Sequence, residues 1–432
     1  MIHLFKSAAA RAFTYGLMAV IGVGLLIGAV RLTLPFADLF RAQLAATLSE
    51  TLGLGVEMGG LRLRLAGMVP RVTLQGVDLR DPVTGEPQLE LQALHLDLDL
   101  LATLRALAPK VASLTLEGAR LQVERHADGS IAIAGLRGVE AGDPRAMTFF
   151  LGNGSFRLTG SELHWVDHLA QAPPLRLTDV NVRFENRASR HRIGLRARLA
   201  GDAASRLHVA ADLQGEPDRL ADWSGDLYLE VRGGDVGTLL NGRVPVPAGL
   251  RSDGLRLRVW NRVAASRIRD ALALARVAGP SLAAGGGAQG PPGAEWLEAR
   301  LLWRSQENGW RLAVPELTLA WPGSRQTSLG LEVRYRSAAS GAWRLAADTG
   351  DLDLAELQAV LAAYEPDHRL IAALGRAAPG GELRELRLHV AGGGGGATRW
   401  TLRGDVRGLA LNPAEPIPGL RGLDARFEAS AE

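Results

Sequence analysis

Leucine at every second residue is the feature that most restricts how this chain can fold. The stretch "LELQALHLDLDL" covers residues 89–100. In its second half, leucines alternate with polar residues: Leu94, Leu96, Leu98 and Leu100 on one parity, and His95, Asp97 and Asp99 on the other. This period of two predicts a β-strand with one apolar and one polar face. Similar alternation recurs along most of the 432 residues, so the sequence predicts a mainly β protein. It leaves open what the leucine rows face.

The parity of the leucines changes at Ala93–Leu94, which predicts a bulge or a corner in the sheet. "LLATLRALAPK" and the segment from about 352 to 375 have helical periodicity. "VASLTLEGARLQVERHADGSIAIAGL" predicts a hairpin that turns at "ADGS". Residues 283–295, rich in glycine and proline, predict a flexible linker or loop.

The composition argues against several classes of protein. There is no cysteine, which excludes disulfides and thiolate metal sites. The net charge is +3, and the basic residues are almost all arginines that alternate with acidic residues along the strands. No cluster of basic residues with stacking aromatics occurs, so a nucleic-acid partner is not expected.

A membrane anchor is predicted near the N-terminus. Residues 12–30, "AFTYGLMAVIGVGLLIGAV", carry no charge and are long enough to span a bilayer. Lys6 and Arg11 precede this segment, which predicts a cytoplasmic N-terminus at residues 1–11 and an exported body. A cleaved signal peptide is the alternative. Gly24 and Gly28 form a GxxxG pattern that could pair two such helices.

The predicted organisation is the following: 1–11 cytoplasmic N-terminus, 12–30 transmembrane anchor, 31–53 juxtamembrane helix, 54–282 first β segment, 283–295 linker or loop, and 296–432 second β segment with a helix at about 352–375. Alternation of Leu423, Ala425 and Phe427 continues to the end of the sequence. We therefore expect the chain to be the N-terminal part of a longer protein.

Candidates for chemistry are few. His164 and His168 have a spacing that could grip a metal on a helix, but their surroundings alternate like a strand. Asp351 and Asp353 precede a predicted helix, where an acidic cap is expected. No motif of a hydrolase, a nucleotide-binding site or a zinc protease is present, so we expect neither an enzyme nor a cofactor. The tryptophans favour packing or edge protection, with an interfacial belt as the alternative: Trp165, Trp223, Trp260, Trp303, Trp310, Trp321, Trp343 and Trp400.

The order of these segments resembles the AsmA-like family of bacterial envelope proteins, and within it the YhdP branch. The N-terminal resemblance lies in "LSETLGLGVEMGGLRLRLAGMVPRVTLQGVDLRD", "LHLDLDLLATL" and "VASLTLEGARLQVERHADGSIAIAGL". It continues in "SELHWVDHLAQAPPLRLTDVNVRFENRASRHRIGLRARL", "DWSGDLYLEV", "GLRLRVW" and "AAPGGELRELRLHV". The resemblance covers nearly the whole chain and rests on the order of the motifs.

The resemblance implies a fold and a function. The fold would be a long twisted antiparallel sheet rolled into an open apolar groove that spans the periplasm. The groove would carry phospholipids between the inner and outer membranes of a Gram-negative-type envelope, with the inner membrane and outer-membrane or periplasmic envelope proteins as further partners. The lipid-facing candidates on the leucine parity are Leu94, Leu96, Leu98, Leu100, Leu114, Leu116, Leu121 and Val123.

Other functions remain open at this point. In a packed sandwich or solenoid, the same leucines would only fill a core. An anchored structural or regulatory protein that affects outer-membrane assembly through protein contacts is the second candidate, and an anchored hydrolase is the third.

Overall fold

The computed structural model describes the following residues: 38–39, 41–52, 54–66, 69–82, 84–85, 87–106, 110–128, 131–133, 154–216, 219, 222–235, 239, 250–265, 267–282, 294–321, 325–338, 340–364, 369–393, 396–413 and 419–431. The predicted anchor at 12–30 and residues 1–11 lie outside this set, as does the linker at 283–295 apart from residues 294 and 295. Among the helices of the described ranges, none is both long and apolar enough to cross a membrane.

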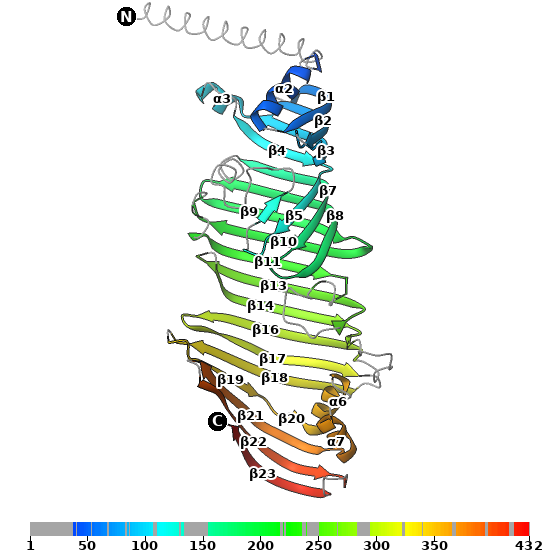
Figure 1. Cartoon of the computed structure of the whole chain (residues 1–432), viewed down its shortest axis with the longest axis vertical. Helices are drawn as coiled ribbons and strands as arrows, with labels where there is room; N and C mark the ends of the chain where they lie inside the picture. Colours follow the sequence, from blue (N-terminus) through cyan, green and yellow to red (C-terminus); the bar gives the residue numbers. More distant parts are fainter. Residues whose placement is uncertain are drawn as a thin grey trace, which may run out of the picture. The chain divides into compact units, whose positions relative to one another are not determined.

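The described residues are mainly β, as predicted, with a few short helices (Figure 1). They divide into two compact units: residues 1–165 with 178–187 form unit 1, and residues 166–177 with 188–432 form unit 2. Strands pair with their neighbours along the chain in both units, and almost all of these pairings are antiparallel. Each unit is described by itself below.

Unit 1 is built on an antiparallel series β1–β2–β3–β4, followed by a parallel pairing of β4 with β7. The β5–β6 pair is the hairpin predicted around "ADGS". The elements are α2 (Arg41–Leu52), β1 (Gly55–Ala66), β2 (Val69–Arg80), β3 (Pro87–Leu98), α3 (Leu100–Ala106), β4 (Val111–Glu117), β5 (Arg120–Arg125), β6 (Ile131–Ile133), β7 (Ser155–Asp167) and β8 (Ala172–Arg187). The end of β7, residues 166–167, and the beginning of β8, residues 172–177, belong to unit 2.

The change of face predicted at Ala93–Leu94 occurs in unit 1 without a bulge, and we call this point the corner. Strand β3 keeps an unshifted register with β2 through Ala93 and Leu94, so its apolar side chains change from one face to the other. Next to this point, Gly76, Gly118 and Gly160 have φ angles of 54°, 62° and 55°, a region that favours glycine. The apolar side chains of β3 that precede the corner are buried, as are their neighbours on adjoining segments: Val77, Leu79, Leu89, Leu91 and Ala119.

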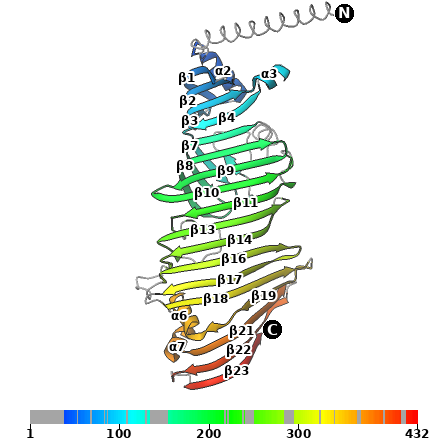
Figure 2. The same ribbon diagram turned by 180° about the vertical axis from the view of Figure 1, so that it is seen from behind.

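Unit 2 is an antiparallel sheet in which the strands follow one another in chain order (Figures 1 and 2). Its elements are β9 (Arg190–Leu199), β10 (Asp202–Gln214), β11 (Ser224–Arg232), β12 (Leu250–Arg251), β13 (Gly254–Ala264), β14 (Arg267–Ala278), β15 (Ser281–Leu282), β16 (Trp296–Gln306), β17 (Gly309–Trp321), β18 (Arg325–Ser337), β19 (Trp343–Thr349), β20 (Leu352–Asp353), α6 (Leu354–Tyr364), α7 (Arg369–Ala377), β21 (Gly380–Gly393), β22 (Gly396–Leu411) and β23 (Leu420–Ala431). Strands β12 and β15 form a separate pair.

Side-chain caps set the starts of the short helices. Asp99 accepts a hydrogen bond from the backbone N–H of Ala102 at 2.9 Å, where α3 begins. Asp353 accepts one from the backbone N–H of Glu356 at 2.9 Å and confirms the predicted acidic cap. The helical segment predicted at about 352–375 contains two helices, α6 and α7, and its first residues, Leu352–Asp353, pair with β21 instead.

The polar face of unit 1 carries a network across β2, β3 and β4. The guanidinium of Arg71 donates to both carboxylate oxygens of Asp97, at 2.6 and 2.9 Å, and Ser113 Oγ donates to Asp97 at 2.8 Å. His95 lies between Thr73 and Glu117, at 3.0 and 3.2 Å. The prediction that His95 and Asp97 share the polar face is confirmed.

This network gives unit 1 a pH dependence. Hydrogen bonds from the Arg71 side chain hold the pKa of Asp97 below its ordinary value of 3.8. A lowered carboxyl pKa adds stability at pH values above the ordinary pKa, and that stability is lost as the pH falls through the lowered pKa.

We expect Asp97→Asn to lower the free energy of unfolding by about 1 kcal/mol at pH 7. The difference from the wild type should narrow below about pH 4 and disappear at lower pH. Urea unfolding followed by circular dichroism between pH 7 and pH 2 measures it. Asp78→Asn is the control, because Asp78 makes no ion pair with a described residue. A difference for Asp97→Asn that stays constant with pH would contradict the assignment.

Candidate functional site

Two rows of apolar side chains cross the strands of unit 1. Residues directly opposite each other on paired strands share a face, so the register defines the rows. The first row is Leu61, Leu74, Leu94, Leu116 and Leu158. The second row is Leu63, Val72, Leu96, Leu114 and Phe156.

The two rows differ in burial. In the first row, next to the corner, Leu74 is 2% exposed and Leu158 is 4% exposed. Every member of the second row is half-buried. A leucine row in the middle of a two-layer core would be buried throughout. The second row is therefore covered on one side less completely than a packed core requires.

The structure brings most of the predicted lipid-facing residues together. Leu94 lies opposite Leu116, and Leu96 lies opposite Leu114. Leu98 lies opposite Val111, after an irregularity in the register.

The other three candidates lie elsewhere. Leu100 leaves the strand, because it begins α3, and it is 39% exposed. Leu121 and Val123 lie in β5, beyond the corner, and Val123 is 9% exposed. None of these three belongs to the two rows, and whether any of the candidates contacts lipid stays a prediction.

Unit 2 repeats the arrangement on a larger number of strands. One row is Leu195, Val209, Leu229, Val259, Ala273 and Leu301. The next is Ala197, Leu207, Val231, Leu257, Ala275, Ala299 and Leu317. We call this surface the apolar face of unit 2. The leucines and valines of these two rows are half-buried.

One margin of the apolar face is closed. Leu255 and Val277 are 5% and 9% exposed and pack with Leu239, which comes from outside the strands. At this cluster, the apolar face is covered by other side chains of the protein. Val231 and Leu257 of the second row also pack against the cluster, yet both stay half-buried. The described leucines and valines of both rows therefore offer half-buried hydrocarbon to a further partner.

The opposite face of unit 2, the charged face, carries ion pairs across neighbouring strands. Asp270 and Arg304 are 2.7 Å apart, and Arg311 and Glu332 are 2.7 Å apart. Arg190 donates to Asp212 and lowers the pKa of that carboxyl. Such exposed pairs each contribute little to stability, about 0–1 kcal/mol. Their main effect is to keep this face in contact with water.

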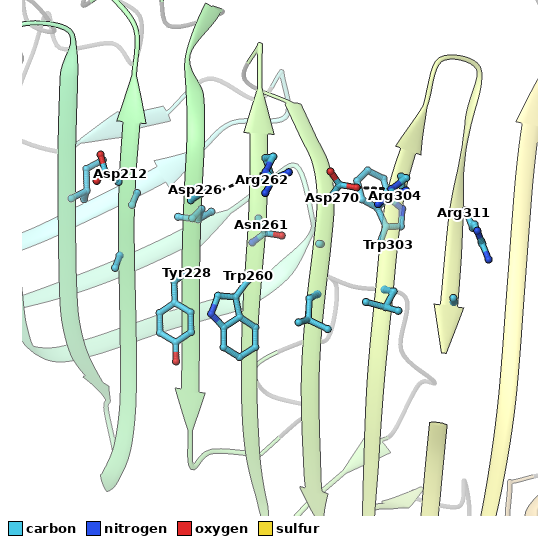
Figure 3. Close-up of a pocket in the computed structure, with 18 of the residues that line it drawn as sticks. Asp212, Asp226, Tyr228, Trp260, Asn261, Arg262, Asp270, Trp303, Arg304 and Arg311 are labelled. Carbon is cyan, nitrogen blue, oxygen red and sulfur yellow. Dashed lines mark hydrogen bonds and ion pairs between the residues drawn. The ribbon is translucent and has the colours of Figure 1, made fainter. Parts of the chain in front are cut away.

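A cavity of about 980 Å³ opens on the charged face (Figure 3). Its floor holds a short aromatic and apolar stretch in which the rings of Tyr228 and Trp260 are 5.4 Å apart. The ion pairs Asp226–Arg262 and Asp270–Arg304 flank it. This hollow of unit 2 therefore does not coincide with the leucine rows, and the alternation of the sequence gave no signal for it.

The metal and capping candidates occupy ordinary structural positions. His164 lies within β7, whereas His168 lies just after the strand ends. Within the described ranges, no three histidine, aspartate or glutamate side chains converge on a possible metal position. The apolar rows of both units can bind hydrocarbon through dispersion and the exclusion of water.

Comparison with known proteins gives a family. No curated protein and no solved structure matches the chain. The family model described as "YhdP protein" matches residues 1–432, the whole sequence. This agrees with the resemblance found in the order of the sequence motifs. The chain belongs to the YhdP family.

Proposed function

We propose that this chain is an inner-membrane-anchored periplasmic protein that carries phospholipids between the inner and outer membranes along its apolar strand faces. The observation that carries the proposal is the half-buried state of the second row of unit 1 and of the leucines and valines in the two rows of unit 2. Membership of the YhdP family supports it, because bridge-type lipid transport is what the resemblance of the sequence implies.

The energetics of lipid transfer explain why such a face is useful. Exposing an acyl chain to water costs roughly 0.8 kcal/mol per CH₂ group, or roughly 20 kcal/mol for the two chains of a phospholipid. Leucine and valine rows replace water on one side of the chains and remove much of that cost. The same rows gain burial when lipid covers them, so loading lipid also stabilises the protein.

The arrangement of the two faces fits this role. A strand with apolar side chains on one face and ion pairs on the other can hold lipid without exposing a second apolar surface to water. In unit 1 the leucine rows and the Arg71–Asp97 pair lie on opposite faces of the same strands. The groove itself, rolled around the lipid, is part of this proposal.

The two faces of β3 provide a direct test. A photo-crosslinking amino acid placed at Leu96 should capture labelled phospholipid, because Leu96 belongs to the half-buried apolar row. The same amino acid placed at Asp97 should not, because Asp97 faces the polar side. Crosslinked lipid is detected by mass spectrometry. Equal capture at both positions, or capture at neither in well-folded protein, would show that the facing assignment is wrong.

A charge on the apolar row should block lipid. Leu96→Asp places a carboxylate among acyl chains, at a cost on the order of 2.5–3.5 kcal/mol. We expect the uptake of labelled phospholipid to fall for Leu96→Asp and to change little for Asp97→Asn. Both variants must first show wild-type circular dichroism and protease resistance, since a buried Asp also destabilises an ordinary core. Full uptake by folded Leu96→Asp would show that the row of Leu96 does not contact the acyl chains.

The anchor at 12–30 and the periplasmic location are tested separately. A reporter fused after Glu432 that is active only outside the cytoplasm should be active, because Lys6 and Arg11 favour a cytoplasmic N-terminus. Mass spectrometry of the purified protein should find residues 12–30 still attached. An inactive reporter would place the body in the cytoplasm, and a mature N-terminus after Val30 would show a cleaved signal peptide.

A further inference from the structure

Three arginines gather at one margin of the charged face of unit 2. Arg336 of β18 lies directly opposite Arg344 of β19, and Ala391 of β21 lies between Arg344 and Arg399 of β22. All three arginines are exposed. We call Arg336, Arg344 and Arg399 the arginine margin.

The arginine margin lacks the carboxylates found elsewhere on this face. Arg304 and Arg311 pair with an acidic residue of a neighbouring strand. Among the described residues, no ion pair involves any arginine of the margin. Like charges directly opposite each other on paired strands destabilise the sheet. A bound anion would relieve this repulsion.

The margin surrounds a hollow of about 540 Å³. Ala346 and Ala391 lie on the same face as the arginines and leave space between them. Arg334, His389 and Thr401 also line the hollow. Arg334 lines the hollow but is not part of the arginine margin, and it pairs with Glu332 and Asp348. The lining is thus rich in hydrogen-bond donors, and guanidinium groups match the oxygens of a phosphate in geometry and charge.

The other face of the same margin carries aromatic side chains. Trp310 stacks on Tyr335 with ring centroids 5.7 Å apart, and both lie in one row with Trp400. Trp343 lies against Gly392, where an added Cβ would be 2.8 Å from the indole ring. Trp and Tyr are typical of the level where hydrocarbon meets polar groups. Next to this aromatic row, on the same side of the sheet, lies an apolar row that we include in the apolar face: Leu312, Val333, Ala347, Leu388 and Leu402.

The arginines and the aromatics meet at the strand ends. Arg336 follows Tyr335 in the chain, Arg344 follows Trp343, and Arg399 precedes Trp400. Alternation therefore places each arginine on the charged face and its aromatic neighbour on the apolar face. An amphipathic lipid lying at this margin would meet indole and phenol rings on its acyl side and guanidinium groups on its headgroup side.

We propose that the arginine margin binds the phosphate of a phospholipid headgroup while the acyl chains lie on the apolar face beyond the aromatic side chains. This inference rests on the proposed function and adds a headgroup site to it. Because the contacts are made to a phosphate, the margin favours phospholipids over neutral lipids with the same acyl chains. It does not distinguish among phospholipids by acyl length.

Binding of two matched lipids to the full chain in detergent tests this. The probes are fluorescent phosphatidylglycerol and the corresponding diacylglycerol, which lacks the phosphate. Wild-type protein should bind phosphatidylglycerol about tenfold more tightly than diacylglycerol. The triple variant Arg336→Gln, Arg344→Gln, Arg399→Gln should lose this preference and keep its affinity for diacylglycerol. Circular dichroism verifies that the variant is folded.

A second triple variant controls for net charge. Arg196→Gln, Arg256→Gln and Arg300→Gln remove the same charge from exposed positions elsewhere on the charged face. This control should keep the preference for phosphatidylglycerol. Loss of the preference in both triple variants, or in neither, would overturn the assignment of the margin.

Two further outcomes are informative. One distinguishes a lipid phosphate from inorganic phosphate, and the other distinguishes failure of the headgroup site from failure of the proposed function. Inorganic phosphate should compete poorly with phosphatidylglycerol, because it lacks acyl chains to contact the aromatic side chains. If inorganic phosphate competes as well as the lipid, the margin is a free-phosphate site and the headgroup assignment is wrong. If wild-type protein binds neither lipid, the proposed function fails, and the headgroup site fails with it.

Discussion

The structure depends on one constraint: in a paired strand, alternation and register together fix the face of every side chain. Leu94 and Leu96 are apolar at every second position, and their pairing with Leu116 and Leu114 turns two local patterns into continuous rows. A shift of one residue in that register would move leucines to the polar face and break the Arg71–Asp97 contact. The ion pairs and the apolar rows therefore support the same register from opposite faces.

Much of the secondary structure could be predicted because its causes are local. The run "SFRLTGSELHWVD" coincides with β7, and "LLATLRALAPK" contains α3. The corner was visible as a change in leucine parity at Ala93–Leu94. The position of Leu100 at the start of α3 could not be predicted in this way. An apolar residue at the end of a strand continues the alternation whether or not it starts a helix. Asp99, the cap of α3, was instead counted with the polar parity of the strand.

The candidate sites were harder to predict because they form across strands far apart in the sequence. Trp310, Tyr335 and Trp400 share a row only through the register of the intervening strands. Arg336 and Arg399 look like any other solvated arginines in the sequence, and only the register shows that no carboxylate lies between them. The cavity beside Trp260 likewise depends on side chains from several strands. Local periodicity predicts on which face of a strand each side chain lies. The register determines which side chains from different strands become neighbours on that face.

The central claim is that the apolar faces hold phospholipid, and the lipid content of the purified protein tests it most directly. The full chain is extracted in mild detergent, and its bound lipids are quantified by mass spectrometry against protein, with a detergent-only sample as control. The account predicts phospholipid in the protein fraction, at more than one molecule per chain if the apolar rows form a continuous path. Folded protein that carries no phospholipid, and takes up none when it is offered, would contradict the account.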